Sequence, residues 1–215
     1  MALRPTSKSK RPKRQLARVD PERALTLDEI VRLKTWAHAI LADDDAHIAV
    51  TRDAAIVLVL LGTAARRFEL CAFVVGDYRR NPPTIVFSEA KGNRTAAVAI
   101  TNETAAVLDK WLAIKREVGE STAKDAPLFC GRPGEFMATR TLHEVWKRSL
   151  RTAGVDDSYG VHASRHAAAM ALISATKSLL LARDLLRHAS ITTTEREYGH
   201  LLASDLRAGL ERAGL

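Results

Sequence analysis

The stretch that determines the fold most directly runs from His162 to His200 and reads HASRHAAAMALISATKSLLLARDLLRHASITTTEREYGH. It opens with two histidines and an arginine, and it closes with a histidine and a tyrosine ahead of a Gly-His pair. Apolar residues in between recur at helical spacing, which predicts helices over about 162–174 and 177–186. The stretch therefore places side chains that bind phosphate or move protons on helical segments.

Outside this stretch, the pattern predicts a mainly α fold with a small antiparallel β-sheet, an α+β class. Thr26 followed by two acids marks a helix start. The β-prone runs Thr84–Phe87 and Ala97–Ile100 flank Gly92-Asn93, which is typical of a hairpin. The helix at 51–61 is apolar on nearly every face, so we expect it at the centre. The remaining helices are predicted over about 26–41, 66–74, 102–117 and 139–153.

Composition limits the class of protein. The chain has 215 residues, of which 47% are hydrophobic and 27% charged, so it can bury the core of one domain. The longest apolar run, Ile56–Leu61, is far shorter than the roughly 20 residues of a membrane span, so we expect no membrane and a cytoplasmic location. Cys71 and Cys130 form no C-x-x-C motif, so we expect reduced thiols.

The positive charge is concentrated at the N-terminus. Residues 1–23 hold eight basic and two acidic side chains, a net +6 of the total +8. We therefore predict a flexible basic arm or linker over 1–22, followed by one domain over 23–215. The arm either follows nucleic-acid phosphates or is only a solvated leader, and charge alone does not decide between them. Its candidate DNA-binding side chains are Lys8, Lys10, Arg11, Lys13 and Arg14.

Taken singly, each chemically notable residue has an ordinary structural explanation. Arg66 and Glu69 are spaced to pair on one helical face. Lys91 lies at the hairpin tip, where most lysines are only solvated. His162 and His166 have zinc-binding spacing, but Ala163 replaces the glutamate of the zinc-protease motif and no third ligand is evident. We therefore predict no metal and no cofactor.

Taken in order, these residues resemble the tyrosine recombinase (phage integrase) family. The most specific matches are His162-x-x-Arg165-His166 and the segment from His188 to Tyr198-Gly-His. The resemblance begins near Leu25 and continues to the C-terminus. The catalytic set that it implies is Arg66, Lys91, His162, Arg165, His188 and Tyr198, with Glu69 and His166 in support. Two positions depart from the family pattern, because Ala64 and Arg187 stand where the family usually has glycine.

The resemblance implies a specific chemistry. A tyrosine, here Tyr198, attacks a DNA phosphodiester and forms a covalent 3′-phosphotyrosine, without metal or ATP. Arg66 and Arg165 suit the charge on the non-bridging oxygens, because a guanidinium is a permanently charged fork. His188 donates to the same oxygens, while His162 accepts the tyrosine proton. Lys91 protonates the departing 5′ oxygen. The expected catalytic fold is that of DNA breaking-rejoining enzymes.

The expected partners are double-stranded DNA and further copies of the chain. The resemblance implies a tetramer on two DNA sites, held through the tyrosine region or the C-terminal segment. Leucines at helical spacing in Leu201–Leu215 suit such a contact.

Several alternatives remain open at this stage. A type IB topoisomerase uses the same residues to relax DNA, and a regulator derived from a recombinase would bind DNA without cutting it. Most family members carry a helical DNA-binding domain before the catalytic one, and here only the arm precedes Leu25. The chain is therefore either a fragment or similar to the compact fimbrial-inversion recombinases.

Overall fold

The structure is a computed structural model that describes residues 24–88 and 95–203. Within these residues the fold is mainly helical with one three-stranded antiparallel sheet, which confirms the predicted class. No helix in these two ranges is both long enough and apolar enough to span a bilayer. The helices are α1 (Leu27–Ala42), α2 (Ile48–Thr63), α3 (Arg67–Ala72), η2 (Val75–Asp77, a 3-10 helix), α4 (Asn102–Glu117), α5 (Thr139–Thr152), α6 (His162–Thr176), α7 (Leu179–Leu186), α8 (Ile191–Tyr198) and α9 (His200–Ala203).

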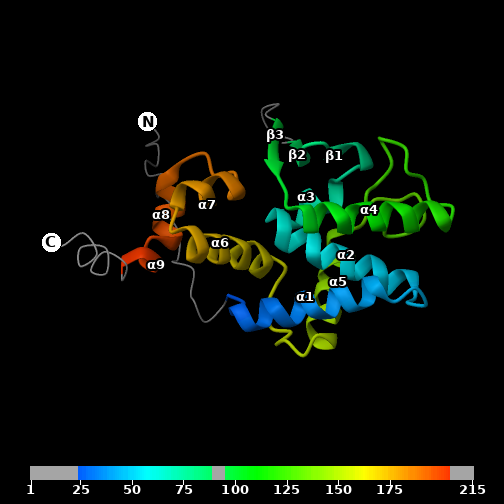
Figure 1. Ribbon diagram of the computed structural model, residues 1–215, viewed down its shortest axis with the longest axis horizontal. Helices are drawn as coiled ribbons and strands as arrows, with labels where there is room; N and C mark the ends of the chain where they lie inside the picture. The colour runs from blue at the N-terminus through cyan, green and yellow to red at the C-terminus, as the bar shows by residue number, and fades with distance from the viewer. Residues whose placement is uncertain (1–23, 89–94, 204–215) are drawn as a thin grey trace, which may run out of the picture.

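Helix α2 is the centre of the larger core. Eight of its residues from Asp53 to Leu60 are buried in succession, so the helix contacts protein on every side. It packs against α1, α4, α5 and α6 (Figure 1). Gly62 permits the close approach of α4, because a Cβ there would lie 2.3 Å from Thr104 Oγ1. The prediction of a central helix is confirmed.

The helix starts follow from local chemistry. Thr26 caps α1 by accepting a hydrogen bond from the Glu29 main-chain N–H, and the Glu29 carboxylate accepts one from the Thr26 N–H at 2.8 Å. These reciprocal bonds satisfy main-chain donors that a helix start otherwise leaves unpaired. The helix ends at Ala42, with Asp43 as its C-cap, close to the predicted end at about 41.

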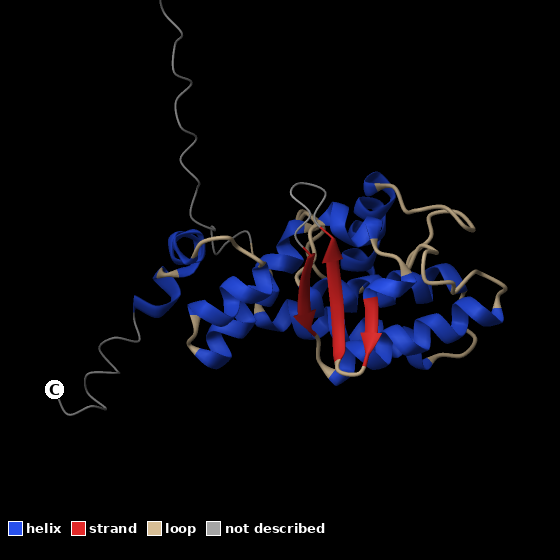
Figure 2. Ribbon diagram, turned by 90° about the horizontal axis from the view of Figure 1, so that it is seen from above, coloured by secondary structure: helices blue, strands red, loops and turns tan. Residues whose placement is uncertain are grey.

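The sheet lies along one side of the helical body (Figure 2). Its order is β1 (Tyr78–Arg80), β2 (Pro83–Ser88) and β3 (Thr95–Ala99). Strands β2 and β3 pair with Ile85 opposite Val98, as the predicted hairpin requires. The sequence did not predict β1, which is only three residues long. The hairpin tip with Lys91 lies outside the described residues.

Helices α6 to α9 form a smaller region beside the main body, at the left of Figure 1. They share a second apolar cluster of Ala64, Ala169, Ile173, Ala182, Leu186 and Tyr198. Helix α8 was missing from the sequence prediction. Leu201 and Leu202 pack on this cluster of their own chain, although we expected their segment to contact another subunit. Residues 204–215, like the basic arm at 1–22, lie outside the described part.

Candidate active site

Arg66 lies at the turn between α2 and α3, and Glu69 holds it there. The Arg66 main-chain N–H donates to Glu69 Oε2 at 2.6 Å, and its Nη1 donates to Oε1 at 2.7 Å. Burial raises the pKa of Glu69, but the charges of Arg187 and Arg66 outweigh it and hold the pKa below its ordinary value. Glu69 therefore stays ionised and fixes the direction of the Arg66 side chain, as the predicted pairing implied.

Arg165, on the first turns of α6, is only 3% exposed. Its Nη1 donates to the Ala64 carbonyl at 2.6 Å, and its Nη2 donates to the Leu186 carbonyl. Burial, Arg66 and Arg187 lower its pKa to about 10, so it remains protonated at neutral pH. Its charge is thus held in place by main-chain dipoles, and α2, α6 and α7 meet at this side chain.

Ala64 supplies one of those carbonyls from a left-handed conformation, with φ 50°. Arg187, which ends α7, is left-handed as well, with φ 53°. These are the two positions where the sequence departs from the glycines of the family. Glycine adopts this conformation without a steric penalty, so the structure explains why the family pattern has glycine at both places.

Arg187 packs inside the site. Its Nη2 donates to Glu69 Oε2 at 2.7 Å, and its Nη1 donates to the Leu185 carbonyl at 2.9 Å. Its guanidinium carbon lies 3.6 Å above the centre of the Phe87 ring. The sequence marked Arg187 only as a departure, and gave no sign of these contacts.

The three histidines lie at the same site, and surrounding protein lowers all three pKa values. The pKa of His162 is lowered by partial burial of its ring and by the charges of Arg165 and Arg66, although the residue as a whole is exposed to solvent. Burial and neighbouring positive charge lower the pKa of His166 and of His188 to about 4. All three are therefore neutral at pH 7, so each ring has one nitrogen that donates and one that accepts.

His188 is oriented by α8. Its Nδ1 lies 3.0 Å from Thr194 Oγ1, and Thr194 is fully buried. If the threonine hydroxyl donates, the proton of His188 is on Nε2, which is then free to donate toward a phosphate. Thr194 could not be assigned this role from the sequence, because a threonine in a Thr-Thr-Thr run carries no distinguishing signal.

Tyr198 ends α8 and is 1% exposed. Its hydroxyl lies 2.6 Å from His166 Nδ1, so the structure places His166 on the tyrosine where we expected His162. The rings of His162 and His166 are themselves in edge contact, 4.5 Å between centres. Burial raises the pKa of Tyr198, so a base or a bound phosphate must assist its ionisation.

Five of the six predicted catalytic residues therefore come together, and the sixth, Lys91, lies outside the described residues. Besides burial, the nearby Arg165, Arg66 and Arg187 guanidinium groups lower the pKa of His188, so these side chains face one site. Among the described residues, no group of three or more His, Cys, Asp or Glu is arranged to hold a metal ion. Positive charge exceeds negative charge here, which suits an anionic ligand.

Solved structures with the same fold are recombinases and integrases. A crystal structure of XerA recombinase matches with a TM-score of 0.70 and 27% identity, over 88% of this chain and 64% of that chain. XerH recombinase bound to palindromic difH substrate matches with a TM-score of 0.69 and 24% identity, over 89% of this chain and 52% of that one.

Curated relatives agree with the structural matches. Tyrosine recombinase XerD of Corynebacterium glutamicum is 28% identical over 183 residues, and tyrosine recombinase XerC of Bifidobacterium longum is 32% identical over 163 residues. These alignments cover 85% and 73% of this chain, and 58% and 45% of the relatives. The family description "Phage integrase family" matches residues 23–204, which include every described residue. The chain belongs to the phage integrase family.

Proposed function

We propose that the chain is the catalytic domain of a site-specific DNA recombinase. It cleaves and rejoins double-stranded DNA through a 3′-phosphotyrosyl intermediate on Tyr198, using neither metal nor ATP. The observation that carries the proposal is the convergence of two arginines, two histidines and this tyrosine from separate segments of the chain. The relatives named recombinases and the structural match solved on its DNA substrate support this reading.

The arginines supply the charge stabilisation. A phosphodiester gains negative charge on its non-bridging oxygens as the nucleophile attacks. Arg66 is held by a carboxylate and Arg165 by carbonyls, so both are fixed before the substrate arrives. Preorganised charge of this kind lowers the barrier, because no reorganisation is needed during the reaction. His188 adds a hydrogen bond from Nε2.

The tyrosine must leave its present partner before it reacts. Its hydroxyl is buried on His166, so attack on a phosphate held by the arginines requires a shift of α8. We propose that His166 holds the hydroxyl before cleavage and that His162, in edge contact with His166, accepts the proton. A phosphate next to these rings raises their pKa values by its negative charge, which improves them as bases.

The proposed general acid and the proposed DNA-binding arm lie in segments that the structure does not describe. Lys91 is proposed as the acid that protonates the 5′ oxygen, and β2 and β3 lead into its hairpin. The basic arm, with Lys8, Lys10, Arg11, Lys13 and Arg14, is proposed to contact DNA phosphates. The protein is expected to act in the cytoplasm, on DNA.

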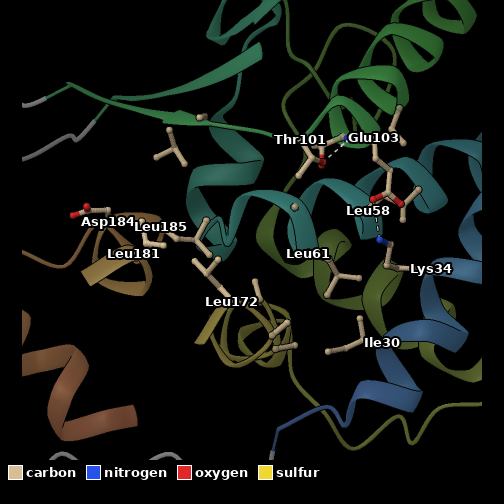
Figure 3. Close-up of a pocket in the computed structure, with 18 of the residues that line it drawn as sticks. Ile30, Lys34, Leu58, Leu61, Thr101, Glu103, Leu172, Leu181, Asp184 and Leu185 are labelled. Atoms are coloured by element: carbon tan, nitrogen blue, oxygen red, sulfur yellow. Dashed lines mark hydrogen bonds and ion pairs between the residues drawn. The ribbon is translucent and has the colours of Figure 1, made fainter. Parts of the chain in front are cut away.

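Assembly into a tetramer through the C-terminal segment is also part of the proposal. An apolar groove of about 570 Å³ runs between α1, α2, β3, α4, α6 and α7. In Figure 3 Lys34, bonded to Glu103, lies on one side of it and Asp184 on the other. We propose that residues 204–215 of a second copy dock there, since Leu206 and Leu210 are apolar at helical spacing and Arg207 complements Asp184.

A suicide-substrate assay tests the central proposal. Nicked DNA that loses a short fragment after cleavage traps the covalent adduct, which migrates with the protein in denaturing gels. Wild type should form the adduct in excess chelator. Tyr198→Phe should form none while it binds DNA with nearly unchanged affinity, because only the nucleophilic hydroxyl is lost.

The same assay separates the alternatives. Tyr159→Phe is the matched control and should form the adduct normally. An adduct on Tyr198→Phe would mean that another residue is the nucleophile. Relaxation of supercoils without exchange between two sites would indicate a topoisomerase, and DNA binding without adduct would indicate a non-catalytic regulator.

A further inference from the structure

Arg187 is the one described cation of the site that the proposed chemistry leaves without a role. It ends α7 in a left-handed conformation, immediately before His188. A side chain in this conformation carries a steric cost that glycine does not. The side chain of Arg187 must offset that cost through its own contacts.

Those contacts join three separate segments. Glu69 on α3 binds the Arg187 guanidinium at 2.7 Å, and the Thr63 carbonyl at the end of α2 accepts from it at 3.3 Å. The guanidinium carbon of Arg187 lies over the ring of Phe87 on β2, 3.6 Å from its centre, a distance typical of a cation–π contact. Arg187 thus links the end of α7 to the α2–α3 turn and to the sheet.

Each linked segment carries a residue of the proposed reaction. Glu69 shares its carboxylate between Arg187 and Arg66, one oxygen to each side chain. Phe87 is the residue before the last of β2, and β2 leads toward Lys91. A movement of Arg187 would therefore displace the arginine clamp and the base of the hairpin together.

We propose that Arg187 is a positioning residue that braces the site through Glu69 and Phe87, and that it does not itself bind the DNA phosphate. Its side chain is 5% exposed and engaged by a carboxylate, carbonyls and an aromatic ring, so it is directed into the protein. The inference rests on the proposed function, since the brace serves the cleavage step.

Arg187→Gly tests this role, because glycine favours the left-handed backbone. The variant should fold, and its thermal midpoint should not fall below that of wild type by more than a few degrees. Adduct formation should slow by about 10- to 100-fold, since small misplacements of catalytic groups have effects of that size. Lys177→Gly is the matched control, because Lys177 is left-handed with φ 56° at the end of α6. It should cleave like wild type.

The salt dependence of DNA binding separates a brace from a phosphate contact. Loss of one phosphate contact reduces the slope of log K against log salt by about 0.9, whereas loss of a brace leaves the slope unchanged. Glu69→Ala and Arg187→Gly together should slow cleavage by less than the product of their separate effects, because both changes break the Arg187–Glu69 link. A reduced slope, or independent effects that multiply, would overturn the proposal.

A lysine variant tests whether positive charge alone is enough. Arg187→Lys keeps the charge but loses the flat fork, so it should fold and recover only part of the rate. It replaces the glycine variant if that one does not fold, and a lysine variant that cleaves at the wild-type rate would overturn the proposed role of Arg187.

The adduct assay on wild type separates this proposal from the proposed function. If wild type forms no adduct, the proposed function fails, and the proposed role of Arg187 fails with it. If wild type forms the adduct and Arg187→Gly matches it, only the brace fails.

Discussion

Two buried cations lie in the two regions of the molecule, and their partners differ. Lys115, in the body built around α2, is 0% exposed and pairs with the Glu120 carboxylate at 2.7 Å. Arg165, in the α6–α9 region, is nearly as buried but donates to two main-chain carbonyls. The Lys115–Glu120 pair carries no net charge, whereas carbonyl dipoles hold Arg165 without a counter-charge. Arg165 therefore adds net positive charge to its site, where Arg66 and Arg187 share the single carboxylate of Glu69.

The apolar clusters of the two regions differ in size. The body buries a large cluster that includes Trp111, Trp146 and Phe129. The smaller cluster holds three alanines, and its largest member is Tyr198, the proposed nucleophile. The body thus gains stability from apolar volume, and the smaller region depends on polar contacts that also serve the chemistry. Changes in the two regions should separate stability from activity.

The largest expected effect comes from exchanging each buried cation for methionine. Arg165→Met should reduce adduct formation by at least about 10²- to 10³-fold, the loss typical of one preorganised charge donor. Lys115→Met should leave adduct formation unchanged but lower the stability, because it removes one partner of a buried ion pair and leaves the Glu120 carboxylate without it. Single-turnover cleavage and urea denaturation of both variants measure this. Equal losses of activity would remove the distinction between the regions.

A smaller effect is expected from truncating one leucine in each cluster. Leu60→Ala in the body should lower the free energy of unfolding by about 2–5 kcal/mol, since it leaves a cavity on a helix that is packed on all sides. Leu186→Ala should cost less, because partly exposed leucines next to it can shift into the space. It should nevertheless slow cleavage more, since loss of the leucine side chain loosens the end of α7, whose main-chain carbonyl at position 186 holds Arg165. The reverse order in either measurement would contradict the comparison.

The smallest expected effect is a dependence of stability on pH. The pKa of His166 is lowered to about 4 by burial and by His162, Arg165 and His188. Between its unfolded pKa of about 6.5 and that value, the unfolded chain binds a proton that the folded chain does not, so stability falls as the pH falls. The thermal midpoint should drop by a few degrees from pH 7 to pH 5. In His166→Asn, which can still accept from the tyrosine, it should drop less.

An exposed histidine provides the control for that measurement. His143→Asn changes a side chain on the surface of α5 and should leave the pH dependence of the thermal midpoint as it is in wild type. If His166→Asn and His143→Asn both follow wild type, His166 does not contribute to acid sensitivity.

The sequence predicted the helices of the body well, because long amphipathic or apolar segments with capping residues carry a strong periodic signal. It did not predict β1 or α8, which are too short for periodicity to be detected. It identified Arg66, Arg165, His162, His188 and Tyr198 as one group only through their order and spacing along the chain.

The partners within the site could not be predicted from the sequence. The contact between His166 and Tyr198, and that between Arg187 and Glu69, depend on how α6, α7 and α8 pack against α3. Residues 32 and 118 positions apart meet in these contacts, and no local pattern records such distances. The left-handed residues Ala64 and Arg187 were visible as departures from glycine, but their conformations were not.

Helix α8 is eight residues long, which makes it a lever of about 12 Å with the nucleophile at its far end. Gly199 directly follows Tyr198 and leaves no room for a side chain, because a Cβ there would lie 2.5 Å from the Glu195 carbonyl oxygen. The hydrogen bonds of Tyr198 with His166 and of Thr194 with His188 are among those that hold α8 in its present position. Under the proposed mechanism the reactive species is a minor member of the native ensemble, and its population would set a ceiling on the rate of DNA cleavage.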